Sequence, residues 1–468
     1  MINEFVSLVN NILWGDGQVL IIMLLACGIW FTVKLGGVQL RHFGHMFSLL
    51  KGSNTSTKDG ISSFQALCTS LSARVGTGNL AGVAVAISLG GAGAIFWMWM
   101  IALLGMATGF AESVLGQLYK VRDENGEFRG GPAYYIKQGL NKTWLAVAFS
   151  LCLFFGYGFV FSAVQANTIT DALNNAYSFP TEYVGLAIIA LAALIVVGGL
   201  KSIARFAEFV VPFMGIGYVL VALAITFINI SELPAMLLDI VKSAFGLQEA
   251  GAGALGAAIK NGIQRGLYSN EAGSGSVPHA AARAVPNPNH PVSQGYIQML
   301  GVFLDTLVLC TSTAFIILLA GGSSSDQMEG IRLTQDAMSS HLGEGGTDFV
   351  AAAISLFAFT SVVANYAYGE SNLHMFKLDN KIGRAVYTIG YLGMIYWGAQ
   401  AALPQVWAMA DMALGLMTVI NIIAIVWMTP TIVSISKDYF KKKDSGANME
   451  YKAGDCEIQG KSEEGIWD

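Results

Sequence analysis

Charged residues are scarce in this sequence of 468 residues. Asp, Glu, Lys and Arg make up 12% of the chain, whereas 54% is apolar and the mean hydropathy is +0.55. A soluble globular domain carries about 25% charged residues because its surface must face water. The scarcity of charge therefore excludes an ordinary soluble protein and indicates that most of the outer surface faces lipid.

Several chemical signatures are missing as well. The net charge of −5 and the lack of a basic stripe exclude a nucleic-acid partner. The five cysteines form no CxxC pair, and the six histidines include no HExxH zinc motif. Neither a GxxxxGK[ST] phosphate loop nor a GxSxG nucleophile elbow is present. We therefore expect no enzyme, no cofactor and no ATP-driven pump, and no feature indicates an obligate protein partner.

Long apolar stretches, in contrast, are abundant. A helix needs about 20 apolar residues to cross a bilayer, and we expect eleven such spans in an all-α membrane protein. They lie near residues 17–35, 62–90, 94–118, 144–170, 183–199, 207–229, 250–278, 294–320, 347–375, 385–402 and 406–436.

Basic residues predict the orientation, because membrane proteins retain Lys and Arg on the cytoplasmic side. With the N-terminus outside, most of the 26 Lys and Arg residues fall in inward loops or in the tail. Only Lys242 and Arg332 then fall in outward loops. We expect a multi-pass protein of the plasma membrane with an extracellular N-terminus and a cytoplasmic C-terminus.

Glycine and polar residues interrupt two of the eleven spans at mid-length. The first reads LSARVGTGN at residues 71–79, and the second reads YSNEAGSGS at residues 268–276. The two align without a gap, and each opens a run of five spans. Because five is odd, the second run starts on the opposite side of the membrane. Paired interruptions in two inverted halves are typical of secondary transporters, which bind their ligands at mid-membrane depth.

This pattern divides the chain into five parts. We expect an N-terminal helix with a cytoplasmic loop, a first repeat, an extracellular connector, a second repeat and a cytoplasmic tail. Their bounds are 1–61, 62–229, 230–249, 250–436 and 437–468.

Unwound backbone at the first break offers groups for two kinds of ligand. The N–H groups of Thr77, Gly78 and Asn79, at the start of a half-helix, attract a carboxylate such as that of an amino acid. The carbonyl groups released between Ser72 and Val75 suit a monovalent cation, which binds oxygen. The first break therefore predicts a site for an amino acid and a cation.

Polar residues of two further spans are candidates for the same site. The adjacent hydroxyls of Thr360 and Ser361 can complete a shell of oxygen atoms around a cation, although such hydroxyls commonly bond to their own helix. Gln165 and Asn167 carry amides that are costly in lipid and should face the interior. We expect Gln165 to contact the substrate or a gate, and helix-to-helix hydrogen bonding is the alternative.

Three charged residues lie in or beside the interrupted spans: Arg74, Arg265 and Glu271. Arg74 and Glu271 occupy equivalent places in the two halves, so an ion pair between them would neutralise both near the site. The alternative is that each charge meets water in an open vestibule.

Three motifs resemble the alanine or glycine:cation symporter family. They are GGAGAIFWMWM at 90–100, RGGPAYYI at 129–136 and SNEAGSG at 269–275. The likeness runs from about residue 10 to residue 436. It implies a sodium-coupled, sometimes proton-coupled, uptake carrier for alanine and glycine. It also implies the five-plus-five inverted-repeat fold of the amino acid-polyamine-organocation carriers.

The resemblance also implies roles for residues. It implies that the first break binds the substrate carboxylate. It also implies that the second break receives the amino group and limits the size of the substrate side chain. With Gln165, the expected substrate site comprises Thr77, Gly78, Asn79, Gln165, Ser269, Gly273 and Ser274. The resemblance implies that a sodium ion binds to the carbonyls of Ser72 and Val75 and to the hydroxyls of Thr360 and Ser361. Arg74 departs from relatives in the wider fold, which usually have an uncharged residue there.

We therefore predict a symporter that imports alanine and glycine with sodium by alternating access, surrounded by membrane lipid. A proton-coupled carrier of the same fold, with Glu271 as the protonated group, is the nearest alternative. A channel would require a continuous polar path, whereas the polar residues here gather at one depth. A membrane enzyme is the weakest alternative, because no nucleophile is paired with a base.

Overall fold

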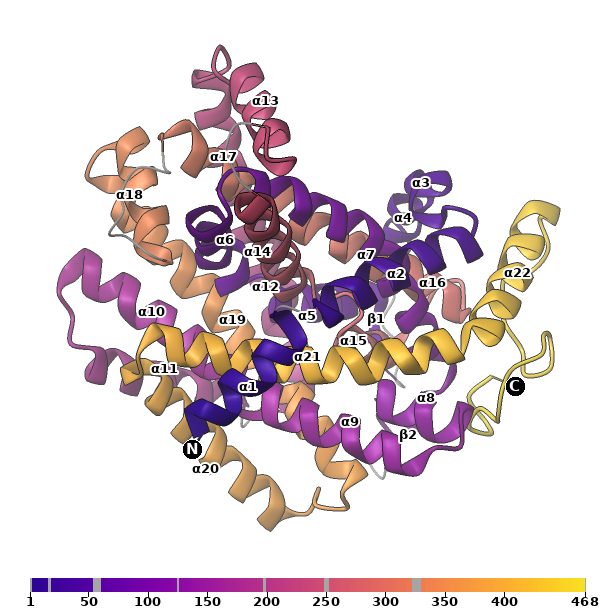
Figure 1. Ribbon diagram of the computed structural model, residues 1–468. Helices are drawn as coiled ribbons and strands as arrows, with labels where there is room; N and C mark the ends of the chain where they lie inside the picture. The colour runs from indigo at the N-terminus through magenta and orange to yellow at the C-terminus, as the bar shows by residue number, and fades with distance from the viewer. Residues whose placement is uncertain are drawn as a thin grey trace.

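The computed structural model describes residues 2–15, 18–53, 60–123, 126–196, 199–247, 252–321 and 330–467. These residues are mostly helical. A helix satisfies every interior backbone N–H and C=O within the segment, which an apolar chain in lipid requires. Figure 1 shows helix α21 (Leu403–Trp427) running across the molecule, with α22 (Thr429–Ser445) and the C-terminus at its right-hand end.

Six helical stretches in the described part of the chain are long and apolar enough to cross a membrane. They are Gly93–Leu118, Thr143–Tyr177, Ser202–Ile228, Pro291–Leu319, Gly345–Leu373 and Leu403–Trp427. A seventh arises if Asn3–Trp14 and Val19–Lys34, which are bent by 41°, count as one span. The other expected spans are the two interrupted ones and the helices α11 (Thr181–Val196) and α20 (Lys381–Gln400). The arrangement of eleven spans stays a prediction.

Helix α12 (Gly199–Ile228) shows most directly that lipid surrounds the protein. Phe209, Phe213, Ile216 and Leu220 recur every three or four residues along it, and each is at least 60% exposed. Large apolar side chains in such a stripe would aggregate in water, so they face lipid. The helix begins well before residue 207, where the sequence predicted its start.

Both interrupted spans are broken helices, as predicted. The first consists of α5 (Ser63–Arg74), an extended residue at Val75, a π-helical turn η1 (Gly78–Gly82) and α6 (Val83–Gly90). The second consists of α14 (Ala252–Asn270) and α15 (Val277–Arg283), with non-helical residues 271–276 between them.

A short sheet ties the two broken helices together. Strand β1 (Ile61–Ser62), which precedes α5, pairs in parallel with β4 (Ala284–Val285), which follows α15. Ile61 lies opposite Ala284. Strands β2 (Val121–Arg122) and β3 (Phe128–Arg129) form a separate antiparallel pair.

The remaining elements complete the bundle. They are α1 (Ile2–Trp14), α2 (Val19–Lys34), α3 (Val38–Arg41), α4 (Phe43–Leu50), α7 (Gly93–Leu118), α8 (Pro132–Gly139), α9 (Thr143–Phe155), η2 (Gly156–Val160), α10 (Phe161–Tyr177), α13 (Leu233–Ala244), α16 (Pro291–Val302), η3 (Phe303–Cys310), α17 (Thr311–Leu319), α18 (Ile331–Leu342) and α19 (Gly345–Met375). The span expected at 406–436 divides instead at Met428, between α21 and α22.

Packing places the two breaks inside the bundle. Helix α7 packs along α14, α15 and α16, and α10 packs along α19 and α20. The first broken helix contacts both groups of helices, because α5 packs against α19 and α12 while η1 packs against α14. Polar groups of α7, α10 and α19 therefore reach the unwound backbone.

Candidate functional site

Side chains satisfy the backbone N–H groups that the first break leaves free. The Gly76 N–H donates to Asn79 Oδ1 at 2.9 Å. The Thr77 N–H donates to Gln165 Oε1 at 2.9 Å, and the Thr77 hydroxyl donates to the same oxygen at 2.6 Å. Gln165 thus places one neutral oxygen before two donors, where the sequence predicts the substrate carboxylate.

The two polar residues singled out on α10 have different surroundings. Gln165 reaches the first break, whereas the Asn167 amide donates to the carbonyls of Gly398 at 2.9 Å and Ala401 at 2.7 Å. Asn167 therefore holds α10 to the end of α20, which is the helix-to-helix role considered for both residues.

Asn79 and Ser269 join the two broken helices through a buried carboxylate. Asn79 Nδ2 donates to Ser269 Oγ at 3.0 Å and to Asp305 Oδ1 at 2.8 Å. The Ser269 hydroxyl donates to Asp305 Oδ2 at 2.7 Å. Asp305, on η3, has no exposed surface and was missing from the predicted site. The signal for it was present, because an acid inside an apolar span marks a functional site by default.

Oxygen atoms of α5 and α19 converge where the sequence predicts sodium. The Ser361 hydroxyl lies 2.9 Å from the Ser72 carbonyl oxygen and 3.3 Å from that of Val75. It lies 3.3 Å from the Phe357 carbonyl oxygen as well, which adds an oxygen that the sequence reasoning missed. The Thr360 hydroxyl donates at 2.8 Å to the Phe357 carbonyl of its own helix. Carbonyl oxygens of three residues, two from the end of α5 and one from α19, therefore lie around the Ser361 hydroxyl.

A carboxylate of α7 holds the second break open. Glu112 Oε1 accepts the Gly273 N–H at 3.0 Å, and Oε2 accepts the Gly275 N–H at 3.1 Å. Asn421, on α21, donates to Glu112 Oε2 at 2.7 Å and to the Gly273 carbonyl at 2.9 Å. Glu112 was also missing from the prediction and has no exposed surface. The unwound backbone therefore keeps its hydrogen bonds by taking partners from two other helices.

Glycine conformation explains the sequence of the second break. Gly273 and Gly275 have φ values of +91° and +86°, which favour glycine because it lacks a Cβ atom. The Ser274 hydroxyl donates to the Glu271 carbonyl at 2.7 Å. Gly273 thus bonds to Glu112 and Asn421, and Ser274 bonds within its own loop. Ser269, in contrast, faces the first break.

A small cavity lies between the two breaks. It has room for about one water molecule, at about 10 Å³. Its walls come from both broken helices and from α10, α19 and α21. The lining residues are Ala73, Arg74, Phe161, Gln165, Tyr268, Glu271, Asn365 and Leu414.

The expected ion pair between Arg74 and Glu271 is absent from the described residues, so that prediction was wrong. Arg74 Nη2 donates instead to Gln298 Oε1 at 3.3 Å, on α16. Glu271 Oε2 accepts the Ser276 hydroxyl at 2.6 Å. Arg74 is therefore bonded to a neutral amide, and the Glu271 carboxylate to a hydroxyl.

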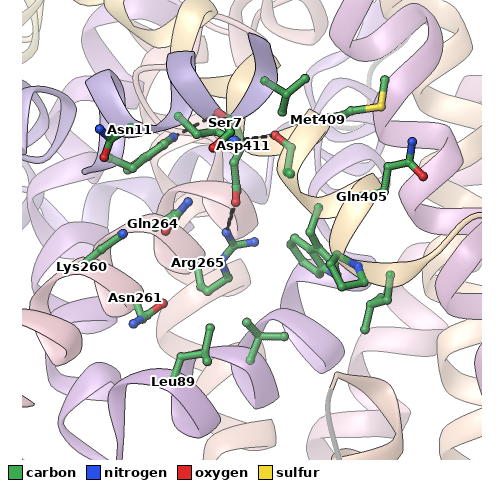
Figure 2. Close-up of a pocket in the computed structure, with 18 of the residues that line it drawn as sticks. Ser7, Asn11, Leu89, Lys260, Asn261, Gln264, Arg265, Gln405, Met409 and Asp411 are labelled. Carbon is green, nitrogen blue, oxygen red and sulfur yellow. Dashed lines mark hydrogen bonds and ion pairs between the residues drawn. The ribbon is translucent and has the colours of Figure 1, made fainter. Parts of the chain in front are cut away.

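A larger pocket of about 880 Å³ opens beside α1, α14 and the start of α21. Figure 2 shows Arg265 and Asp411 joined within it. Arg265 Nη2 lies 2.6 Å from Asp411 Oδ1 and 2.5 Å from Oδ2. The Arg265 guanidinium also lies 4.5 Å from the centre of the Trp407 ring. Arg265 therefore meets a carboxylate and an aromatic face instead of open water.

This ion pair lies between the pocket and the small cavity. Arg265 and Asp411 line the pocket, while Tyr268 and Leu414, one helical turn further along α14 and α21, line the cavity. The Tyr268 ring packs on the Trp407 ring with centroids 4.7 Å apart. A polar layer and an aromatic layer thus separate the cavity from the pocket.

Comparison with known proteins finds relatives that match nearly the whole chain. The profile of the sodium:alanine symporter family matches residues 1–453. The chain is 46% identical to the probable sodium/glutamine symporter GlnT of Bacillus subtilis, over 95% of this chain and 92% of that protein. It is 41% identical to the putative sodium/proton-dependent alanine carrier protein YrbD of Bacillus subtilis, over 95% and 93%. It is 37% identical to the sodium/alanine symporter AgcS of Methanococcus maripaludis, over 93% and 97%. The chain therefore belongs to the sodium:alanine symporter family, whose members are membrane transporters and not enzymes.

Proposed function

We propose that this protein imports small neutral amino acids, alanine and glycine, together with sodium across the plasma membrane by alternating access. In this proposal eleven helices cross the membrane, and an N-terminal helix precedes two inverted runs of five. The domain bounds are those expected from the sequence. The N-terminus is extracellular and the C-terminus cytoplasmic, so that the pocket beside Arg265 opens outward. Broken helices at matching places in the two runs support this arrangement.

The hydrogen bonds between Thr77 and Gln165 carry the proposal. A substrate carboxylate would take over the Thr77 donors from the Gln165 amide, because a charged acceptor binds N–H and O–H groups more strongly than a neutral one. Gly78 and Asn79 would complete the cradle for the carboxylate. Ser269, Gly273 and Ser274 would form the opposite wall, toward the amino group and the side chain.

Sodium would bind between α5 and α19, at the carbonyls of Ser72 and Val75 and the hydroxyls of Thr360 and Ser361. The Ser361 hydroxyl now fills the space between these carbonyls. The Thr360 hydroxyl would have to turn from its own helix toward the ion. Both residues have no exposed surface, so the ion would lose its water and exchange it for protein oxygen.

One peptide group links the two ligands. The Val75 carbonyl, which would face sodium, and the Gly76 N–H, which faces the break, belong to the same rigid peptide plane. A sodium ion that holds this carbonyl also fixes the direction of the Gly76 N–H, which donates to the Asn79 side chain of the carboxylate site. Occupation of the sodium site would therefore organise the carboxylate site, which is a physical basis for coupling. Moving one charge across 100 mV supplies about 2.3 kcal/mol.

A proton-coupled carrier is the second candidate, and a specific observation favours it. Glu271 lines the small cavity, and its carboxylate accepts the Ser276 hydroxyl. The relative YrbD is named as sodium/proton-dependent. Protonation of Glu271 would remove a buried charge next to the substrate.

Uptake by the purified protein in liposomes separates these proposals. Labelled alanine or glycine should accumulate under an inward sodium gradient at equal pH, and a pH gradient without sodium should drive no uptake. Uptake driven by the pH gradient alone would support the proton-coupled carrier. Unlabelled glutamine should be included as a competitor because one relative is named for it. Competition by glutamine equal to that by alanine would contradict the restriction to small side chains.

Ser361→Ala should raise the sodium concentration needed for half-maximal uptake more than Thr360→Ala does. The Ser361 hydroxyl contacts carbonyls of both helices, whereas Thr360 bonds to its own helix. The contact between a hydroxyl and an ion contributes about 1.5–3 kcal/mol, so we expect the sodium concentration for half-maximal uptake to rise roughly tenfold or more. Ser355→Ala is the matched control, because the Ser355 hydroxyl donates to the Ala351 carbonyl of the same helix. An unchanged sodium dependence in Ser361→Ala would remove this residue from the ion site.

A further inference from the structure

The chain after α22 forms what we call the C-terminal strap, residues 446–467. The strap has no helix or strand, only turns, yet it is packed onto the protein. Tyr451 and Trp467 have 2% and 1% of their surface exposed. The match to the family profile ends at residue 453, so most of the strap lies beyond it. A segment without regular structure that buries two large aromatic side chains is attached at specific points.

Trp467 attaches the end of the strap to α7. Its Nε1 donates to the carbonyl of Leu118, the last residue of α7, at 3.2 Å. Its ring packs edge to face with Tyr451, with centroids 5.6 Å apart. The Trp467 carbonyl accepts the Ala453 N–H at 2.6 Å, which closes the strap into a loop. Trp467 is therefore held by its ring, by its indole N–H and by its backbone.

Lys120 connects Trp467 to the second broken helix. Lys120 Nζ lies 4.8 Å from the centre of the Trp467 ring and donates to the Ala284 carbonyl of β4 at 3.1 Å. Gln117 supports this contact, because its Nε2 donates to the same carbonyl at 2.8 Å. Since β4 follows α15 and pairs with β1, the strap reaches the ends of both broken helices through one lysine.

The middle of the strap is attached to other helices. The Tyr119 hydroxyl donates to the Gln459 carbonyl, and the Gln459 N–H donates to Thr431 Oγ1 of α22 at 2.9 Å. Gly460 packs so closely on Gln138, at the end of α8, that a Cβ atom there would lie 1.9 Å from the Gln138 carbonyl oxygen. The strap itself therefore contacts α7, α8 and α22, and it reaches β4 through Lys120 at the end of α7.

We propose that the C-terminal strap is an autoinhibitory latch on the cytoplasmic gate of this transporter. The inference rests on the proposed function and orientation. Opening toward the cytoplasm requires the half-helices α5 and α15 to separate from their neighbours at this face. The strap is bonded to α7 through Trp467 and to the segment after β4 through the Tyr451 N–H, which donates to the Asn289 carbonyl at 2.9 Å, so the strap must move before that segment can leave α7. Release of the strap, by a partner or by cleavage, would raise the rate of inward opening.

A cysteine at Val285, a half-buried position of β4, reports the opening directly. The five native cysteines are replaced by alanine, since one of them, Cys456, lies in the strap. In this background Trp467→Ala should raise the rate at which a membrane-impermeant maleimide, supplied from the cytoplasmic side, labels residue 285 by about tenfold. Alanine efflux from loaded liposomes should rise in parallel. Glu464→Ala is the matched control, because this side chain is exposed in the same segment.

Unchanged labelling in a folded Trp467→Ala protein would overturn the latch. Deletion of residues 454–468 tests the same point if that variant does not fold, and it should increase labelling at least as much. A third outcome is possible, in which Trp467→Ala is labelled faster but neither the parent protein nor the variant takes up any amino acid with sodium. That result would refute the proposed transport function and leave the latch standing.

Discussion

Gly78→Val should abolish amino acid binding while the protein stays folded. A Cβ atom at Gly78 would lie 3.0 Å from Ser269 Cα and 3.3 Å from Tyr268 Cδ1, so the two broken helices touch here without a side chain between them. The first of these neighbours is backbone, which cannot rotate away. A branched side chain would push η1 from α14 and pull Asn79 from Ser269, to which it donates at 3.0 Å.

The displacement of η1 should weaken amino acid binding more than it lowers the stability of the fold. Overpacking in a protein interior typically costs about 1–3 kcal/mol, which a folded bundle tolerates. The carboxylate cradle, in contrast, depends on N–H groups aimed at one point, and we expect the affinity for alanine to fall at least about 100-fold. Isothermal titration with alanine in sodium measures this, and thermal unfolding in detergent checks the fold.

Gly215→Val provides the matched control for Gly78→Val. Gly215 lies in α12, and no atom lies within 4 Å of a Cβ atom built there, apart from the helix itself. The same substitution should therefore leave alanine affinity unchanged. Wild-type affinity in Gly78→Val would mean that the close contact between the broken helices plays no part in the substrate site.

The sequence alone was sufficient to predict where the two helices break. Glycine pairs beside Ser, Thr and Asn are costly in the middle of an apolar helix unless the backbone there serves another purpose, so residues 71–79 and 268–276 stood out. The structure has its breaks within these residues. Hydroxyls at Thr360 and Ser361 were recognisable because they are adjacent and lie between the apolar residues 356–359 and 362–364.

The partners of the breaks could not be predicted from the sequence. Glu112 and Gly273 are 161 positions apart, and a lone acid in an apolar span does not indicate which backbone it faces. The same limit applies to Asp305, which meets Asn79 across 226 positions. The alignment of the two interrupted spans suggested that Arg74 pairs with Glu271, but aligned positions need not share the same surroundings, and Arg74 turns to Gln298.

Glu112→Ala should both destabilise the protein and stop transport. The change leaves the buried N–H groups of Gly273 and Gly275 without their acceptor. Each buried donor left unsatisfied costs about 1–3 kcal/mol, so two cost about 2–6 kcal/mol. Asn421 keeps its bond to the Gly273 carbonyl but loses the carboxylate. We expect a clearly lower unfolding temperature in detergent and no sodium-driven uptake.

Glu112→Gln separates the role of the hydrogen bonds from that of the charge. The glutamine oxygen can still accept one N–H of the break, while its NH₂ group faces the other donor, so stability should fall between those of wild type and Glu112→Ala. Ser113→Ala is the matched control, because the neighbouring Ser113 hydroxyl is buried without a hydrogen-bond partner in the described structure. If Glu112→Ala unfolds at the wild-type temperature, the second break does not depend on this carboxylate. If Glu112→Gln is as stable as wild type yet inactive, the negative charge itself takes part in transport.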